Sequence, residues 1–533
     1  MSELPNEARY KRVQNFNDSV MARHTTRISP FNAGTFGPGN VDRLLFNIPS
    51  EQGMELDMDT LMFHCDITPS FVGNGAINTT DIYFCNSIES IIHNLKIRKG
   101  TQFLIEDIQR YNYVDSMLMN MVSSDHNNCP GKALMGIGNT IERILYHRSG
   151  KDANGAIVNV FDSTLAKRNY AFPLRLSGIS NYSGLLSTSL IDSVTAFQIE
   201  IELAPANECM VCYTRDAVNN IGAPIDCTYT LTNCYMTYDL VRMEPSYHSQ
   251  LAAAITRGQS LTIPFKTFRT SLYSLPSGTN AITYNINDTV KSLNAIYISF
   301  FAVNEQAKFN IAGRDRLHFP NLKTAQLQVG SFYYPLTPLD CTNQSAHAFI
   351  ELQKSLGLAY LRSESAGVWS FSGQDFIGPR YGTVQNLFYT GANNTGGISS
   401  VDIYPAYSHH GQSWTVYPAT VALDPNNNYA RNTANPQADL AGARLNDTGL
   451  RYMREVCAVT PTNFILAFNM KKVLDLGEGD VAGVDLAASG SGLVSLRLEF
   501  QTGGAPTNYN VIIASLYDAV LEIQNNQQVY KVE

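Results

Sequence analysis

The sequence carries little charge and no surplus of positive charge. Only 16% of its 533 residues are Asp, Glu, Lys or Arg, and the formal net charge is −8. A protein holds polyphosphate through a cationic field and the release of counterions, and this chain has no such field overall. We therefore expect neither direct wrapping of a genome nor sequence-specific binding of nucleic acid.

Long hydrophobic runs are also absent. The longest is AIYISFFAV at 295–303, far shorter than the roughly 20 residues that cross a bilayer as a helix. The start of the chain is polar and lacks the basic-then-apolar order of a secretory signal. We expect a soluble, intracellular product with no transmembrane segment.

The nine cysteines are an odd number spread over a long chain, which argues against a disulfide framework. One cluster has part of the spacing of a zinc site, because Cys209 and Cys212 form a C-x2-C pair and are followed by Cys227 and Cys234. Six residues separate the second pair where a zinc site has two, and no His stands at ligand spacing. We therefore favour buried core thiols over a zinc site.

The motifs of common enzyme classes are missing. The chain has no GxGxxG or GxxxxGK[ST] phosphate loop, no HExxH zinc helix and no GxSxG nucleophile elbow. Adjacent imidazoles at 409–410, close to an indole at 414, suit a metal or a sugar, and the acidic stretch 475–480 offers oxygens for calcium. A solvated loop and an acidic turn are the favoured interpretations. We assign no catalytic, cofactor-binding or metal-binding residue, and we expect no enzyme activity and no cofactor.

Aromatic residues and alternating segments are abundant. The 28 Tyr and 25 Phe residues favour extended, half-buried strands. In GLVSLRLEF, Val494, Leu496, Leu498 and Phe500 alternate with polar residues, which predicts a strand with one buried face. The Gly- and Pro-containing turn that follows predicts that residues 509–523 fold back as a neighbouring strand.

The chain repeats one arrangement of elements. Residues 90–108 predict a hairpin about Gly100 and then a helix at 113–122, and residues 321–336 predict a hairpin about Gly330 and then a helix at 345–357. Further strands match between the halves: 59–67 with 293–303, 197–203 with 496–500, and 227–243 with 510–523. The offset grows from 230 residues at the hairpin to 299 at the later strands, so the second half carries 69 extra residues.

This repeat gives a domain plan for an all-β chain. Many short strands with few helices fit two tandem jelly-roll β-sandwiches better than a parallel α/β sheet. We predict an N-terminal arm at 1–40, a first jelly roll at 41–243, a linker helix at 244–259 and a second jelly roll at 260–533, with a loop-rich surface insertion at about 363–450. The linker helix is expected to begin after an N-cap at Ser246 and to stop at Gly258, and residues 139–148 show a weaker helical pattern.

Four segments in this order carry a family resemblance. They are 172–203, 240–265, 336–357 and 493–532, and the last, with its YDAVLEI strand, is the most specific. Together they resemble the double jelly-roll major capsid proteins of virophages, Polinton-like viruses and adintoviruses, over nearly the whole chain after residue 40.

The resemblance implies a structural protein of the virion without catalytic residues. Three chains would form a pseudo-hexameric homotrimeric capsomer, and such capsomers would tile the shell of an icosahedral DNA virus. The implied partners are neighbouring trimers, penton proteins and minor capsid proteins, with synthesis and assembly inside the host cell. The insertion would project outward, and the arm would lie beneath the shell. Two alternatives stay open: a carbohydrate-binding or carbohydrate-cleaving β-sandwich protein, and a minor capsid or spike component.

Overall fold

The structure is a computed structural model, and most of the predicted β regions lie within the part of the chain that it describes. The described residues are 20–32, 34–71, 80–84, 87–100, 102–119, 144–147, 168–215, 221–224, 226–303, 317–342, 346–356, 402–405, 414–417, 464–472, 483–486, 493–524 and 528–532.

Eight strands of the first half form two antiparallel four-stranded paths. They are β1 (Val20–Ile28), β2 (Arg43–Pro49), β3 (Met54–Phe71), β5 (Ile92–Lys99), β6 (Phe103–Ile108), β8 (Arg168–Phe172), β10 (Thr195–Leu203) and β13 (Cys227–Met243). One sheet has the order β1-β13-β3-β8 and the other the order β2-β10-β5-β6. Every neighbouring pair is antiparallel.

Eight strands of the second half repeat this arrangement. They are β14 (Leu261–Leu275), β15 (Ala281–Asn287), β16 (Leu293–Ala302), β17 (Leu322–Val329), β18 (Phe332–Asp340), β21 (Ile465–Asn469), β22 (Leu493–Phe500) and β23 (Tyr509–Gln524). Their sheets have the orders β14-β23-β16-β21 and β15-β22-β17-β18.

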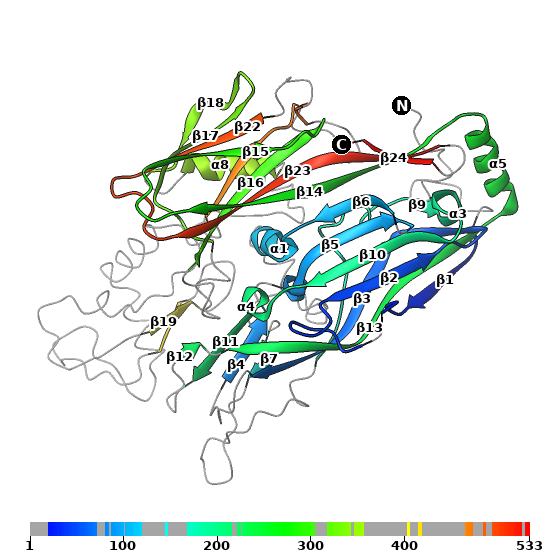
Figure 1. The fold of residues 1–533 in the computed structure, drawn as a ribbon, viewed down its shortest axis with the longest axis horizontal. Coiled ribbons are helices and arrows are strands. Elements are labelled where there is room, and N and C mark those ends of the chain that lie inside the picture. The colour runs from blue at the N-terminus through cyan, green and yellow to red at the C-terminus, as the bar shows by residue number, and fades with distance from the viewer. Residues whose placement is uncertain are drawn as a thin grey trace, which may run out of the picture.

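The two sets of strands share one topology. When the eight strands of either set are counted in chain order, the first sheet runs first, eighth, third, sixth, and the other runs second, seventh, fourth, fifth. This connection of two Greek keys is a jelly roll. The predicted all-β double jelly roll is confirmed, and Figure 1 shows the two jelly rolls side by side in one chain.

The predicted repeat aligns the correct strands. The hairpin about Gly100 is β5–β6 and the hairpin about Gly330 is β17–β18, which hold the same places in their sheets. Both glycines have the positive φ that a side chain disfavours, 54° and 58°. The helices predicted after them are α1 (Tyr111–Met119) and α8 (Ala346–Ser355).

Smaller elements decorate the two jelly rolls. The strands β4 (Thr80–Phe84), β7 (Ile144–His147), β11 (Met210–Arg215) and β12 (Ile221–Pro224) form a separate sheet, and β19 (Asp402–Pro405) pairs with β20 (Trp414–Tyr417). β9 (Leu185–Ser187) pairs with β3, and β24 (Gln528–Val532) pairs with β23. The remaining described helices are η3 (Ile88–Ile91), α3 (Thr188–Ile191), α4 (Ala206–Cys209) and α5 (Pro245–Thr256).

Two local predictions need correction. Residues 144–147, within the helical pattern at 139–148, are strand β7, because pairing with β4 offers their backbone a ladder that outweighs a weak helical period. Residues 20–28, assigned to the arm, are strand β1, which pairs along its length with β13 and so belongs to the first jelly roll. The other domain boundaries stay a prediction, and the insertion at 363–450 lies outside the described residues except for β19 and β20.

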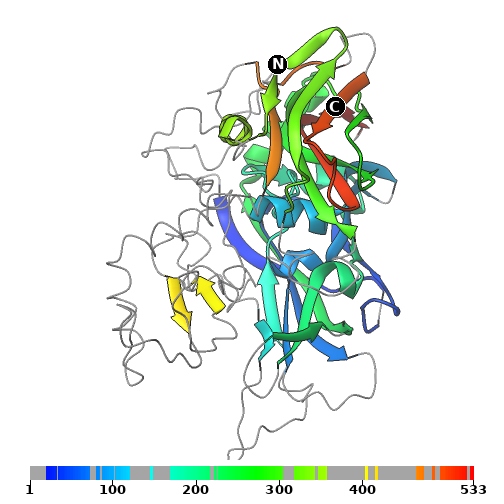
Figure 2. The ribbon, with the colours of Figure 1, turned by 90° about the vertical axis from the view of Figure 1, so that its left-hand side faces the viewer.

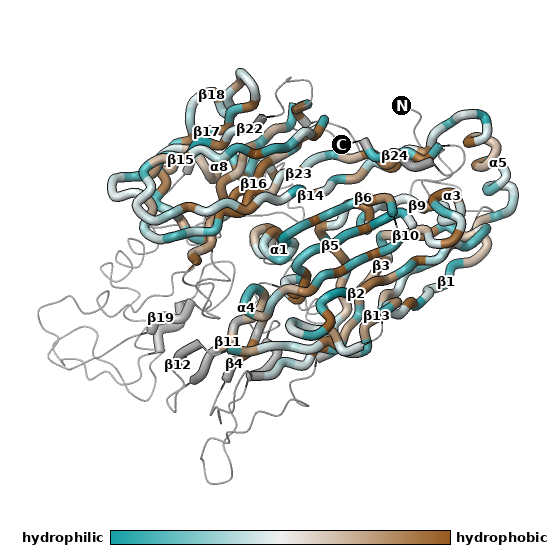
Figure 3. The backbone as a smooth tube through the Cα atoms, in the orientation of Figure 1, coloured by the Kyte–Doolittle hydropathy of each residue, from teal (hydrophilic) through white to brown (hydrophobic). Residues whose placement is uncertain are grey.

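Alternating burial builds the two cores. Val494, Leu496 and Leu498 of β22 are fully buried, as their alternation predicted, and Arg497 between them is exposed. In Figure 3 apolar and polar segments alternate in the same way along β5 and β10. β16 differs, since all ten of its residues are buried, which means that both of its faces are covered.

Candidate interaction surfaces

The described residues show no clustered chemistry. Within them, no three His, Cys, Asp or Glu side chains converge as metal ligands do, and no helix combines the length and apolarity needed to span a bilayer. The residues weighed for metal binding in the sequence, His409, His410, Asp475, Glu478 and Asp480, lie outside the described residues.

The four clustered cysteines are core side chains. Cys209, Cys212, Cys227 and Cys234 are buried free thiols. A hydrogen bond with Cys212, together with burial, raises the pKa of Cys227 above its ordinary value. A thiol that stays protonated behaves as a small apolar group and is a poor metal ligand.

Helix α5 connects the two jelly rolls covalently. Its N-cap is Glu244 and its first residue is Pro245, so the N-cap lies two residues before the predicted Ser246, because proline is preorganised for the first helical position. The predicted stop at Gly258 is confirmed: its φ is 85°, and the amides of Gly258 and Gln259 donate to the carbonyls of residues 255 and 254. This is the Schellman pattern of a helix end.

The same helix docks on the first jelly roll. It buries Tyr247, Leu251 and Ile255. His248 Nδ1 lies 3.4 Å from Oε1 of Glu55 in β3, a carboxyl group with almost no exposed surface. Burial raises the pKa of Glu55 to about 8, and the neighbouring Ser187 side chain offsets only part of that effect.

Non-covalent contacts fix the first jelly roll against the second. Gly178 lies so close to the backbone of Lys266 in β14 that a Cβ at residue 178 would overlap it. The ring of Tyr113 in α1 meets the ring of Phe301 in β16 edge-on, with centroids 5.0 Å apart. β6 packs beside β14, and α1 beside β23. In Figures 1 and 2, α1 lies between the two jelly rolls.

A buried carboxylate holds the loop that makes this contact. Glu106 of β6 accepts hydrogen bonds from the hydroxyl of Ser177, from the amide of Gly178 at 2.9 Å and from the amide of Ile179 at 3.4 Å. Burial raises the pKa of Glu106, and these hydrogen bonds partly counteract it. The carboxyl group thereby fixes the place of Gly178 against Lys266.

A cluster of charged residues with buried carboxyl groups stabilises the other side of the contact. Arg175 donates to Glu89 through Nε and to Asp115 of α1 through a terminal nitrogen at 3.0 Å. Tyr111 also donates to Glu89, and Ser87 donates to Asp115 at 2.5 Å. Burial raises the pKa of Glu89 to about 7 despite the guanidinium, and it raises the pKa of Asp115 as well. The cluster ties the segment before Gly178 to helix α1.

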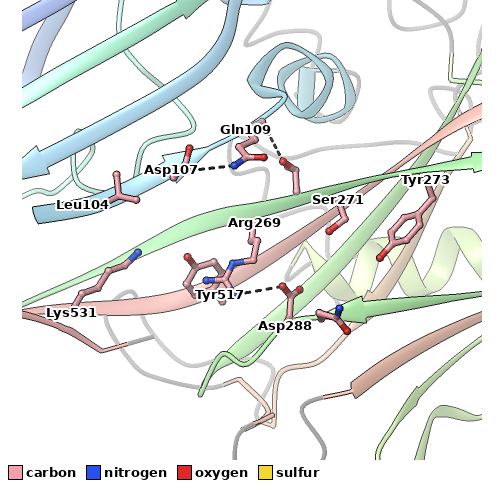
Figure 4. Close-up of a pocket in the computed structure, with 11 residues that line it drawn as sticks. Leu104, Asp107, Gln109, Arg269, Ser271, Tyr273, Asp288, Tyr517 and Lys531 are labelled. Atoms are coloured by element: carbon pink, nitrogen blue, oxygen red, sulfur yellow. Dashed lines mark hydrogen bonds and ion pairs between the residues drawn. The ribbon is translucent and has the colours of Figure 1, made fainter.

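A polar pocket of about 430 Å³ opens beside the contact. Leu104 of β6 lines one wall, while Arg269, Tyr517 and Lys531 line the other. Arg269 lies 5.4 Å from the centroid of the Tyr517 ring and 3.7 Å from Asp288 (Figure 4). Asp107 of β6 and Gln109 also line the pocket, so the junction combines one apolar and two polar side chains of the first jelly roll with cations and an aromatic ring on the β14–β23 side.

The corresponding elements at the two outer ends of the molecule have exposed apolar side chains. β18 holds the place of β6 and α8 that of α1, yet Phe332 is 67% exposed, Leu336 83% and Ile350 49%. β1 holds the place of β14, yet most of its residues are exposed, with Met21 at 58%. In Figure 1, β18 and β1 lie at opposite ends of the molecule.

The residues of the junction carry no sequence motif. Gly178, Lys266 and Arg175 were not predicted as functional, because nothing in the sequence shows that they meet. Glu106 offers one local signal, because it lies midway between Leu104 and Ile108 in FLIEDI, where alternation would place an apolar residue.

Known proteins offer only remote similarities. No family model matches the sequence, and no curated protein does either. Among solved structures, the chain is similar to the cryo-EM structure of the Sputnik virophage, with 11% identity over 98% of this chain and 90% of that chain, at a TM-score of 0.47. The Faustovirus major capsid protein gives 9% identity over 96% and 92% at a TM-score of 0.48, and the mavirus major capsid protein 11% over 100% and 95% at 0.42. Because these values are low, we assign the double jelly roll from the strand order of the chain itself.

Proposed function

We propose that this chain is a major capsid protein of an icosahedral DNA virus and that three copies form a pseudo-hexameric capsomer. One observation carries the proposal: a single chain holds two jelly rolls of the same strand order, side by side and fixed by a tight contact. A threefold ring of such chains presents six similar units, which can pack hexagonally in a shell.

The fixed contact between the jelly rolls favours a rigid structural subunit over a protein whose two domains move relative to each other. Domains joined by a linker alone move relative to each other by default. Here Gly178 and Lys266 touch without room for a side chain, and Tyr113 and Phe301 pack edge-on. A rigid pair of units can repeat the same lattice contacts in every copy.

The role named for two similar structures agrees with this proposal. The Faustovirus and mavirus proteins are each described as a major capsid protein. The sequence resemblance stated above points to the same role. Neighbouring trimers, penton proteins and minor capsid proteins are the partners we propose, with the virion shell as the location and no enzymatic activity.

A carbohydrate-binding function has weaker support. A second hollow of about 500 Å³ lies over β15, β22, β17 and β18, with Tyr333, Gln326 and Gln328 in its lining. A sugar site needs such amides to face the ligand, but Gln326 already donates to carbonyls of β18, and Gln328 donates to that of Gly330. Carbohydrate binding is therefore the alternative function, to be tested second.

Light scattering after size exclusion, followed by electron microscopy, tests the proposal. We expect a particle of three times the 58.8 kDa chain, with a pseudo-hexagonal outline, that forms larger arrays or shells when salt and pH are varied. A protein that stays monomeric in all of these conditions would contradict the capsomer, and glycan-array binding would then test the alternative.

A further inference from the structure

Strand β1 is attached to the first jelly roll with little apolar burial. It lies at the edge of its sheet, where β13 is its neighbour. All nine of its residues are exposed or only partly buried, and Val20 and Ile28 at its two ends pack partly against the core. An element with few buried apolar contacts opens more readily than the rest of a domain. The side chains that connect β1 to β13 and β3 therefore have a large share in its attachment.

The first of these connections lies near the start of the strand. Arg23 pairs with Asp57 of β3 at 2.8 Å and with Asp239 of β13 at 2.7 Å, and Thr25 donates to Asp239 at 2.7 Å. Burial opposes the ionisation of Asp239, but hydrogen bonds from Thr25 and Arg23 and the charge of Arg23 outweigh it and lower the pKa of this carboxyl group. The contact between Arg23 and Asp239 therefore persists in mild acid.

The second connection is a stack of three side chains near the end of the strand. The guanidinium of Arg27 lies 3.7 Å from the centroid of the Tyr235 ring in β13. The imidazole of His64 in β3 lies parallel to the same ring, with 4.5 Å between the centroids and 7° between the planes. Because β1 and β3 flank β13 on opposite sides, the two groups cover opposite faces of Tyr235. We call this row of side chains the Tyr235 stack.

Protonation of His64 brings a second cation into the Tyr235 stack. A neutral imidazole packs on the tyrosine ring without charge, whereas an imidazolium interacts with the same π electrons as Arg27 and repels its guanidinium. Burial and the charge of Arg27 lower the pKa of His64 below its ordinary value of 6.5. Detachment of β1 removes Arg27 and uncovers the stack, so the detached state binds a proton more readily. Acid therefore favours detachment.

The other groups around His64 leave this effect in place. Its Nε2 lies 2.9 Å from Oγ1 of Thr237, and a hydroxyl oxygen accepts from an imidazolium as well as from a neutral ring. Asp66, two residues along β3, accepts a hydrogen bond from Asn169 of β8 at 2.6 Å. Ala171, which lies opposite His64 in β8, carries no charge. The contact with β1 is therefore the one that protonation weakens.

We propose that β1 is a detachable edge strand and that protonation of His64 in mild acid promotes its release from β13. The proton comes from the solvent, and an N–H bond is the only covalent bond that forms. The remaining sheet keeps its order, because β13 stays paired with β3 along most of its length. Release uncovers the edge of β13. The inference goes beyond the proposed function and does not depend on how many copies associate.

Hydrogen exchange followed by mass spectrometry tests the inference on the full chain. Exchange is measured at about pH 7.5 and about pH 5.5 at one protein concentration, and the rates are corrected for the intrinsic effect of pH. We expect the opening of residues 20–28 to increase about 3-fold or more in acid, because each pKa unit of difference between attached and detached states is a factor of about 10. Peptides from β5 and β10, which are far from His64 in the sheet order, should not respond.

Three variants isolate the group that titrates. His64→Phe keeps an aromatic ring against Tyr235 and cannot be protonated, so its β1 should open equally at both pH values. Arg27→Gln removes the cation, which should increase opening at both pH values and reduce the response to acid. The matched control is His24→Gln: His24 is an exposed residue of β1, outside the Tyr235 stack, and its charge lowers the pKa of Asp239. This variant should keep the response.

Several outcomes would overturn the inference. Equal opening of β1 at both pH values in the wild type is one, and an unchanged response to acid in His64→Phe is another. A response that His24→Gln abolishes would assign the effect to the wrong histidine. If circular dichroism shows that His64→Phe is unfolded, the wild type and Arg27→Gln still decide, since an equal response of these two would exclude Arg27. The mass of the wild type in light scattering is a separate measurement, so the capsomer can fail while this inference stands, and the reverse.

Discussion

The substitution Arg175→Met probes the charged cluster that braces the junction. Arg175 is the cation between Glu89 and Asp115, two carboxyl groups with almost no exposed surface. Methionine keeps much of the volume and removes the charge and both hydrogen bonds. Breaking a buried ion pair by removing one partner costs about 3–5 kcal/mol, because the remaining charge is left without compensation.

The loss of stability caused by Arg175→Met should depend on pH in a defined direction. The pKa of Glu89 is about 7 in the folded protein and lower when unfolded, so the stability that this group contributes is full in acid and is lost as pH rises through about 7. Without Arg175 the pKa of Glu89 rises further, and the loss extends to higher pH. At about pH 5.5 Glu89 is protonated in both proteins, so the difference between them falls to the lost hydrogen bonds, about 1–2 kcal/mol, and the interaction of Arg175 with Asp115.

Urea unfolding followed by circular dichroism, at one protein concentration, measures this difference. We expect the loss of about 3–5 kcal/mol near pH 8.5 to be smaller near pH 5.5, where Glu89 is protonated. Arg43→Met is the matched control: Arg43 lies 3.8 Å from Glu200, its side chain is 58% exposed, and its loss should cost less than about 1 kcal/mol. A cost for Arg175→Met no larger than that of the control, or larger in acid than in base, would refute the reasoning.

Two further predictions concern the junction and the linker helix. Gly178→Ala places a Cβ on the backbone of Lys266 and should lower the free energy of unfolding by about 1–3 kcal/mol in urea titrations. In the control Gly278→Ala, nothing lies near the added Cβ, so this variant should lose only the stability that the strain of its positive φ costs. Equal effects of the two substitutions would disprove the tight contact. Glu55→Gln should abolish the loss of stability that the wild type shows as pH rises from the ordinary Glu pKa of about 4.5 to about 8. The variant should therefore gain stability relative to the wild type between about pH 5 and pH 8.5 in thermal melts. A variant that is less stable than the wild type at the higher pH would show that Glu55 is charged there and paired with His248.

Local patterns were enough to locate the strands of both jelly rolls. The alternation in GLVSLRLEF predicted β22 and its buried face, because successive side chains of a strand point to opposite sides. Gly100 and Gly330 marked equivalent hairpins, because each takes a backbone angle that favours glycine. The repeat could be recognised in the sequence because both halves fold with the same order of strands and therefore need similar patterns of apolar and polar residues.

Local patterns failed where a partner distant in sequence decides the outcome. Residues 144–147 lie in a helical period but form β7, since β4 supplies the ladder. Residues 20–28 resemble a polar arm but form β1, since β13 pairs with them from more than two hundred residues away. Ser246 is a good N-cap type, yet Pro245 moves the start of α5 to Glu244.

By itself, then, the sequence determined the class of fold, the duplication and the absence of familiar catalytic motifs, because these depend on residue type and spacing. The tertiary structure alone decided that Gly178 meets Lys266, that Arg175 bridges Glu89 and Asp115, and that β18 and β1 remain exposed while β6 and β14 are joined. Such contacts depend on how the two sandwiches are placed against each other. Placement is set by the sum of many weak contacts between residues far apart in the chain, and no short segment of the chain records it.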